Sequence, residues 1–325
     1  MLHLSIDPPV EKISYTSKII LTGSCFTDHI GRRLADSKLQ VCQNPGGILF
    51  DPFSIYRNLI EVIENKKYVP EDLFKQDDLW HSWNHHSSFS GMEQTAVLGK
   101  INADIENTHE FLRSADWMII TFGTAWQYSL IENNLPVANC HKVPSEKFRK
   151  TLLQSAEITK CFNDLDNRLH EFNPNLKIIY TVSPVRHIKD GIVENNHSKA
   201  RLLDAVHEIV SLNSHNYYFP SYELVIDVLR DYRFYNSDMI HPSEQAIDYV
   251  FDKFIGVYFN DDSKAIYDEI KKWRAMKDHR IIHPDSSAGN KFSKILAGLT
   301  TKLSSKYPFI DFSVSPFKTD HHNPT

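Results

Sequence analysis

Two short segments, far apart in the chain, carry side chains that together could cleave an ester. The first is residues 22–26 (TGSCF), where an apolar run ends, a glycine permits a sharp turn and Ser24 precedes a helical pattern. A serine at the start of a helix can present its hydroxyl while the N–H groups there stabilise an oxyanion. The alternative is that Ser24 simply caps the helix, which is a common role for serine.

The second segment is residues 238–244 (DMIHPSE). An Asp three residues before a His lets the carboxylate reach the near ring nitrogen. That contact fixes the tautomer and leaves the far nitrogen to take a proton from a serine hydroxyl. Asp238 and His241 are therefore the candidate partners of Ser24, and Ser243 is a natural cap for the following helix. The alternative is a surface loop with a coincidental Asp and His, since the chain has 17 histidines.

The composition excludes several other function classes. The 325 residues carry a formal net charge of -5, which argues against a nucleic-acid binder that neutralises phosphates. No GxGxxG follows a strand pattern and no GxxxxGK[ST] occurs, so we expect no nucleotide cofactor. The four cysteines form no CxxC pair. No segment is apolar enough to span a membrane and the N-terminus does not resemble a secretory signal, so we expect a cytoplasmic protein.

Metal chemistry is the main rival enzyme class. Six histidines could supply imidazole ligands, with Asp238 completing a site: His81, His85, His86, His141, His187 and His241. However, no HExxH and no Cys/His finger spacing occurs. We therefore expect no metal.

Short apolar runs that end in turn residues alternate with amphipathic stretches, which indicates βαβ units around a parallel sheet. The expected strands are residues 19–21, 39–42, 117–120, 176–182 and 217–219. Helices are expected over 26–35, 53–63, 145–172, 198–212, 221–230 and 243–258. The sequence thus predicts a doubly wound α/β domain over residues 1–260.

Two regions depart from this alternation. Residues 66–100 are rich in Asp, His, Ser and Trp and are interpreted as an insertion or lid. Residues 261–325 are interpreted as a peripheral helical extension packed on the domain, with a mobile end from about Lys318.

Polar clusters follow the expected strands, and in open parallel sheets ligands bind outside the carboxyl ends of the strands. We therefore expect these clusters to converge on one crevice. They are Gly23-Ser24, residues 45–47 (PGG), Gly123-Thr124, residues 183–187 (SPVRH) and residues 238–241 (DMIH).

An early serine after the first strand and a late DxxH before the last core helix resemble the SGNH (GDSL-like) hydrolase superfamily. Within it, residues 23–26 (GSCF) resemble the signature of the GSCFA-domain family, although Thr27 stands where that signature has Ala. The resemblance spans about residues 15–260 and includes four further blocks: NPGG (44–47), GTAW (123–126), NCH (139–141) and SPVRH (183–187).

The resemblance implies a flavodoxin-like three-layer α/β/α sandwich with about five strands. It implies Ser24 as nucleophile, His241 as base and Asp238 as the group that orients the base. It also implies an oxyanion hole made by the Ser24 N–H, by Gly46 or Gly47, and by an Asn after the third strand. That Asn is missing because Ala125 occupies its position, and Thr124 or Asn139 could replace it.

Other residues could contact the substrate. Cys25 is a stronger intrinsic nucleophile than Ser24, but the resemblance selects Ser24 and leaves Cys25 as a buried apolar residue. His85 and His86 could line the crevice as part of a lid, together with His141. Aromatic residues such as Trp126 line many carbohydrate sites, and Arg186 and His187 could bind an anionic or sugar-like group.

The sequence therefore predicts a serine esterase or deacylase acting on an acyl ester, acetyl and carbohydrate esters included. The same site in an O-acyltransferase is one alternative. A non-catalytic glycan- or acyl-binding module that keeps the fold is another.

Overall fold

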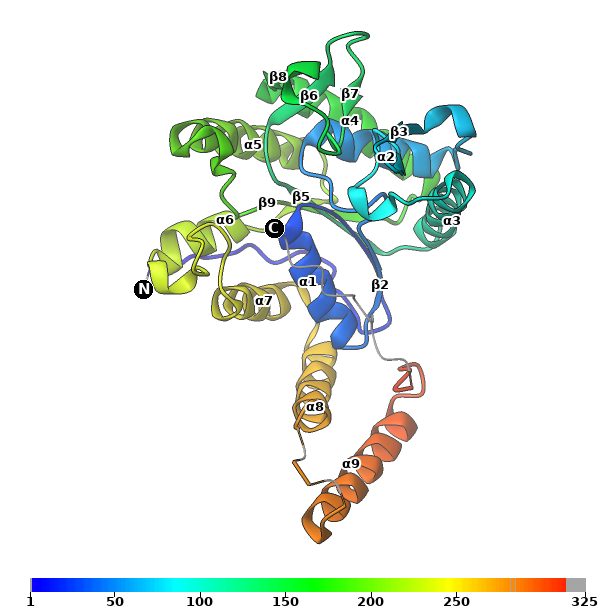
Figure 1. Cartoon of the computed structure of the whole chain (residues 1–325). Helices are drawn as coiled ribbons and strands as arrows, with labels where there is room; N and C mark the ends of the chain where they lie inside the picture. The colour runs from blue at the N-terminus through cyan, green and yellow to red at the C-terminus, as the bar shows by residue number, and fades with distance from the viewer. Residues whose placement is uncertain (1, 281, 284, 314–325) are drawn as a thin grey trace.

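A five-stranded parallel sheet forms the centre of the computed structural model (Figure 1), which describes residues 2–280, 282–283 and 285–313. Across the sheet the order is β10 (Asn216–Tyr218), β9 (Lys177–Val182), β5 (Trp117–Phe122), β1 (Lys18–Gly23) and β2 (Gln40–Gln43). All neighbouring pairs are parallel. This is the flavodoxin-type doubly wound order, whose switch point lies between β1 and β5.

The central strands are apolar on both faces because helices cover both faces. In β1, Ile19 and Leu21 pack into one hydrophobic cluster and Ile20 into another. All six residues of β5 are buried. Successive side chains along each strand therefore point into two separate hydrophobic cores, one on each side of the sheet.

Helices α1 (Cys25–Asp36) and α7 (Glu244–Tyr258) cover one face (Figure 1). The short α6 (Ser221–Glu223) and the π-helical η5 (Leu224–Leu229) complete that layer. The other face is covered by α2 (Pro52–Ile63), α4 (Ser155–Phe172) and α5 (Ile192–Leu212). The architecture is therefore a three-layer α/β/α sandwich, as the resemblance implied.

Two small β units and a long helix lie outside this sandwich. β3 (Phe74–Gln76) and β4 (Leu79–His81) form an antiparallel hairpin within residues 66–100. α3 (Gln94–Leu112) follows it and packs beside α2. A second antiparallel sheet has the order β7 (Pro136–Val137), β6 (Trp126–Leu130) and β8 (Phe148–Leu152). Single turns of 3₁₀-helix connect the other elements: η1 (Pro70–Asp72), η2 (Ser87–Phe89), η3 (Ser145–Lys147), η4 (Ile188–Asp190) and η6 (Tyr232–Phe234).

For two of the expected helices the predicted first residue is wrong. The helix expected from residue 145 begins only at Ser155, because residues 148–152 form β8, a half-buried strand on the edge of the small sheet. At the true start the Glu157 carboxylate accepts a hydrogen bond from the Gln154 N–H at 2.9 Å, a capping-box contact. The helix expected from residue 198 begins at residue 192.

The C-terminal extension consists of α8 (Asp261–Lys277) and α9 (Ser287–Lys306), which project from the α7 side of the sandwich (Figure 1). Trp273 of α8 and Leu303 of α9 are buried against each other's helices and join the core cluster on that face. The end expected to be mobile, from about Lys318, lies outside the described residues. Within the part of the chain that is described, no helix has the length and apolarity needed to cross a membrane.

Candidate active site

The turn after β1 lies at the switch point of the sheet. Gly23 pairs with Thr121 of β5 and has a φ of +134°. A Cβ built on Gly23 would lie 2.1 Å from the Thr121 carbonyl oxygen. Only glycine fits there, and its conformation turns the chain directly into α1 with Ser24 at the first position of the turn.

Ser24 occupies the N-cap position of α1 but its hydroxyl does not cap the helix. The side chains at the corresponding positions of four other helices all accept a hydrogen bond from the first turn: Asp51 (α2), Ser243 (α7), Asn260 (α8) and Ser286 (α9). Ser24 is 1% exposed, and its Oγ has no hydrogen-bond partner among the described residues. Leaving a buried hydroxyl unsatisfied costs about 1–3 kcal/mol, so this arrangement calls for an explanation other than capping.

Asp238 and His241 form a hydrogen-bonded pair within one tight turn. The Asp238 Oδ2 lies 2.7 Å from Nδ1 of His241. The other carboxylate oxygen accepts hydrogen bonds from the N–H groups of Ile240 (2.8 Å) and His241 (3.0 Å). Partial burial opposes ionisation, but these hydrogen bonds prevail and lower the pKa of Asp238 to about 2. The carboxylate is therefore fixed and ionised, and it can hold an Nδ1–H tautomer of His241.

A cavity of about 500 Å³ lies at the carboxyl edge of the sheet. Its lining brings together several of the residues singled out in the sequence: Cys25, Thr124, Trp126, Asn139, Arg186, His187 and His241. The cavity thus reaches Cys25, the residue next to Ser24, and the ring that Asp238 holds. Three of the five polar clusters contribute lining residues, whereas residues 23–24 and 45–47 do not line the cavity.

Gly123 separates Ser24 from the cavity wall. A Cβ built on Gly123 would lie 3.2 Å from the Ser24 Cβ, 3.4 Å from Nε2 of His187 and 3.1 Å from the Phe50 carbonyl oxygen. Phe50 and His187 both line the cavity, with their rings edge to face at 5.4 Å. The missing side chain of Gly123 therefore leaves the space in which the nucleophile candidate and an imidazole face each other.

Lys199 lies beneath this space and was not singled out in the sequence. Its side chain is 1% exposed, and Nζ donates to the carbonyl oxygens of Gly123 (2.6 Å) and Ser183 (2.7 Å). Burial lowers the pKa of Lys199 to about 7. The neighbouring Ser198 Oγ accepts from the Ala125 N–H at 2.7 Å. α5 thereby fixes the ends of β5 and β9, and no sequence motif marks a lysine in this role.

The glycines expected in the oxyanion hole are engaged elsewhere. The Gly47 N–H donates to the Asn44 carbonyl oxygen at 2.8 Å, and the Gly46 N–H donates to Asp104 at 2.8 Å. The Ser24 N–H, the third predicted backbone donor, is also engaged, because it donates to the Thr121 carbonyl oxygen at 3.2 Å. In this conformation none of these N–H groups is available to an oxyanion.

Of the two replacements for the missing Asn, Thr124 is occupied by its protein neighbours. Its Oγ1 lies 3.1 Å from the Ser198 Oγ and accepts from the Trp126 N–H. Asn139 lines the cavity, and its amide oxygen accepts from the His141 N–H at 2.8 Å. The amide NH₂ of Asn139 has no acceptor among the described residues, so it remains the better-placed donor.

Three histidines expected to contact substrate lie away from the cavity. His85 is buried against Tyr68 and Phe89, and burial lowers its pKa to about 3. His141 packs against His81, donates from Nε2 to the Ser82 carbonyl oxygen at 2.8 Å, and has a pKa lowered by burial to about 4. The Cβ of His86 lies against Gly47.

These histidines therefore pack the hairpin region onto the sandwich. Among the described residues no group of three or more His, Cys, Asp or Glu side chains is arranged to hold a metal ion.

Cys25 lines the cavity but its thiol is poorly ionisable. Burial, and secondarily the Asp28 carboxylate, raises the pKa of Cys25 to about 11. The thiolate is the reactive form, so Cys25 is a weak rival of Ser24 as the nucleophile.

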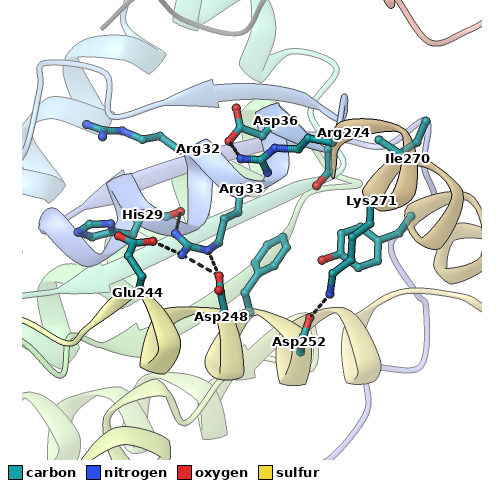
Figure 2. A pocket seen from close by; sticks show the side chains of 13 residues that line it. His29, Arg32, Arg33, Asp36, Glu244, Asp248, Asp252, Ile270, Lys271 and Arg274 are labelled. Atoms are coloured by element: carbon teal, nitrogen blue, oxygen red, sulfur yellow. Dashed lines mark hydrogen bonds and ion pairs between the residues drawn. The ribbon is translucent and has the colours of Figure 1, made fainter. Parts of the chain in front are cut away.

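A second cavity of about 550 Å³ lies along α1, α7 and α8 (Figure 2). Its cations are matched by acids: Arg33 lies between Glu244 and Asp248, while Lys271 pairs with Asp252. Such paired side chains link helices and leave no charge for a ligand, so we do not assign this cavity a site.

Known proteins resemble this chain at two levels, a protein family and a set of solved structures. The model of the GSCFA family matches residues 18–254. No curated protein sequence matches the chain.

Solved structures with a similar arrangement include a carbohydrate esterase family 3 protein from Talaromyces cellulolyticus (9% identity, TM-score 0.35, covering 79% of this chain and 99% of that one). Another is the acetyl xylan esterase Est2A from Butyrivibrio proteoclasticus, with 11% identity and a TM-score of 0.37. The match covers 75% of this chain and 65% of that one. A third, from Streptococcus pneumonia, is described by reference to platelet activating factor, with 10% identity and a TM-score of 0.39. The match covers 74% of this chain and 84% of that one.

Proposed function

The chain belongs to the GSCFA family, and on that premise we propose that it is an SGNH-type serine hydrolase that cleaves an acyl ester with Ser24, His241 and Asp238. The observation that carries the proposal is the Ser24 hydroxyl. It is buried at the N-terminus of α1, neither caps the helix nor finds another partner among the described residues, and adjoins the cavity that holds His241. A nucleophile needs a hydroxyl that is not committed to structural hydrogen bonds.

The proposed reaction begins when Oγ of Ser24 bonds to the acyl carbon. Its proton passes to Nε2 of His241, while the Nδ1–H group keeps its hydrogen bond to the ionised Asp238 carboxylate. The carbonyl electron pair moves to oxygen, and the tetrahedral intermediate then expels the alcohol, which takes the proton from Nε2. Water repeats the sequence on the acyl-enzyme and releases the acid. A second alcohol in place of water makes the same site an O-acyltransferase.

The oxyanion is placed against the N-terminus of α1. Because the Ser24 side chain does not cap the helix, the first-turn N–H groups are not satisfied by it. The NH₂ group of Asn139 on the cavity wall is the proposed side-chain donor. Each such donor typically contributes about 3 kcal/mol to the transition state.

Substrate must displace part of the cavity floor to reach Ser24, because this side chain is 1% exposed. Phe50 and His187 are the cavity-lining side chains beside Gly123, and in the proposal their rings move aside on binding. Movements of this kind commonly complete a catalytic site.

A fluorophosphonate probe tests the proposal. We expect covalent labelling of wild type at Ser24, no labelling of Ser24→Ala, and hydrolysis of acetyl, butyryl or longer aryl esters by wild type only. Ser243→Ala is the matched control, because Ser243 is also a helix N-cap serine near the site but does cap its helix. It should keep the label.

A non-catalytic acyl- or glycan-binding module is the second candidate. The engaged N–H groups of Ser24, Gly46 and Gly47 favour it, because these expected backbone oxyanion donors are bonded to other acceptors. Wild-type protein that binds an acylated ligand but is never labelled would establish the module and overturn the hydrolase.

A further inference from the structure

The end of β5 differs from the ends of the other four strands of the central sheet in its first hydrogen bond. After β1, β2, β9 and β10, the next N–H donates to the carbonyl oxygen of a neighbouring strand: Ser24 to Thr121, Asn44 to Leu21, Ser183 to Phe122 and Phe219 to Tyr180. After β5 the bond leaves the sheet, because the Gly123 N–H donates at 2.9 Å to the Phe50 carbonyl oxygen, just before α2.

The following N–H has the same acceptor. The Thr124 N–H donates to the Phe50 oxygen at 3.0 Å, so two consecutive N–H groups converge on one carbonyl oxygen. Successive N–H groups that converge in this way form a binding site for a negatively charged oxygen. Both distances lie in the range of about 2.7–3.1 Å at which oxyanion-hole donors bind their oxygen. The Phe50 oxygen therefore occupies a position that suits an oxyanion.

These two N–H groups lie beside the proposed nucleophile. A Cβ built on Gly123 would lie 3.1 Å from the Phe50 oxygen and 3.2 Å from the Ser24 Cβ, so both atoms border the same small space. Phe50 and Thr124 also line the cavity that holds His241. A substrate that places its carbonyl oxygen where the Phe50 oxygen lies therefore brings its acyl carbon to the space that Ser24 borders.

The peptide between Gly123 and Thr124 is fixed from its other side. It is trans, so its carbonyl points away from its N–H, and the carbonyl oxygen accepts from Nζ of Lys199 at 2.6 Å. This bond comes from α5 and does not involve Phe50, so it keeps the peptide oriented when the Phe50 carbonyl moves. Donors that need no reorganisation during the reaction are the most effective in stabilising a transition state.

We propose that the N–H groups of Gly123 and Thr124 are the backbone oxyanion donors of this site, and that the Phe50 carbonyl occupies their position until a substrate displaces it. This inference rests on the proposed function. As Oγ of Ser24 bonds to the acyl carbon and its proton passes to Nε2 of His241, the carbonyl electron pair moves onto the oxygen that these N–H groups hold. The movement of Phe50 that exposes the serine thus empties the oxyanion hole at the same time.

Two variants of Thr124 test the donor in solution. Thr124→Pro removes the N–H. Thr124→Ala keeps it and is the matched control, because both variants lack the hydroxyl that bonds to Oγ of Ser198. With an aryl ester we expect kcat of Thr124→Pro to be about 10²–10³-fold below that of Thr124→Ala, with KM little changed. Circular dichroism checks the fold, and equal kcat in the two folded variants overturns the inference.

A crystal structure of the wild-type protein labelled with a fluorophosphonate decides the question whether or not Thr124→Pro folds. Oγ of Ser24 displaces fluoride from phosphorus, and the phosphoryl oxygen then stands where the oxyanion forms. We expect this oxygen within about 3 Å of both N–H nitrogens, with the Phe50 carbonyl turned away. An adduct in which Phe50 still accepts from both N–H groups overturns this inference and leaves the hydrolase proposal intact. If Ser24 is never labelled and no ester is hydrolysed, both proposals fail.

Discussion

Nζ of Lys199, inside the protein, donates at 2.6 Å to the carbonyl oxygen of Gly123, the residue whose missing side chain leaves space beside the proposed nucleophile. A neutral amine has two N–H donors, which match the two carbonyl acceptors, those of Gly123 and Ser183. The third N–H of the ammonium form has no acceptor among the described residues. The geometry therefore suits the neutral form, in line with a pKa lowered by burial to about 7.

We expect Lys199 to make stability pH-dependent. Its pKa is about 7 in the folded state and about 10.5 in the unfolded chain. Between these values the unfolded state binds more protons, so its contribution to the free energy of unfolding rises with pH across that window and is smallest below pH 7.

Lys199→Met should be destabilised by about 2–4 kcal/mol near pH 9, because it leaves two buried carbonyls unsatisfied. The difference from wild type should shrink near pH 6, and urea unfolding at both pH values measures it. A constant difference for Lys199→Met would contradict the assigned ionisation.

Asp238→Asn should lower kcat about 10³–10⁴-fold, since an amide no longer fixes the Nδ1–H tautomer of His241. An amide oxygen can still accept the two N–H bonds of the turn, so the fold should be kept. Steady-state kinetics measures the loss. Asp231→Asn is the control, because Asp231 holds a comparable turn by accepting from the Arg233 N–H; a similar loss there would show that turn geometry, not the carboxylate charge, matters.

The pH–rate profile should show one acid limb. The pKa of Asp238 is about 2, so this carboxylate stays ionised from about pH 4 upward and should not itself reduce kcat/KM in that range. Protonation of the base imidazole should reduce it. A profile without an acid limb is incompatible with the assignment.

Gly123→Ala should reduce kcat/KM about tenfold or more, because its Cβ enters the space between Ser24 and His187. Gly99→Ala is a control with open space around the new methyl group on α3. It should leave turnover unchanged and stabilise the protein by about 0.5–1 kcal/mol. Unaltered turnover in Gly123→Ala would exclude this space from the reaction path.

Cys25 should resist alkylation although it lines the cavity. With a pKa of about 11, almost none of it is thiolate near pH 8. Iodoacetamide should therefore leave fluorophosphonate labelling intact, as read by intact mass. Rapid loss of labelling with alkylation at Cys25 would instead make the thiol a candidate nucleophile.

The sequence predicted the sheet because its central strands β1, β5 and β9 are short, apolar and bounded by turn residues, a pattern typical of buried parallel strands. It misplaced the start of α4 because β8 (FRKTL) is half polar and lies on the edge of the small sheet. There neither the two-residue period of a strand nor the 3.6-residue period of a helix is strong. The hairpin and the small sheet were not anticipated for the same reason. α3 was not anticipated either, although Val97, Ile101 and Ile105 recur at helical spacing.

For the candidate site, local patterns carried more information than long-range ones. The Asp238–His241 contact follows from a spacing of three residues within one turn. The engaged N–H group of Gly46 and the position of Lys199 depend on partners tens of residues away. No spacing in the sequence reveals such contacts.

The two halves of the proposed machinery come from distant parts of the sequence: the turn between β1 and α1 supplies Ser24, and the turn before α7 supplies Asp238 and His241. During translation the serine leaves the ribosome early and the histidine late. A nascent or prematurely terminated chain would thus carry the hydroxyl without its base, and hydrolytic activity would arise only after nearly the whole α/β domain had been synthesised and closed.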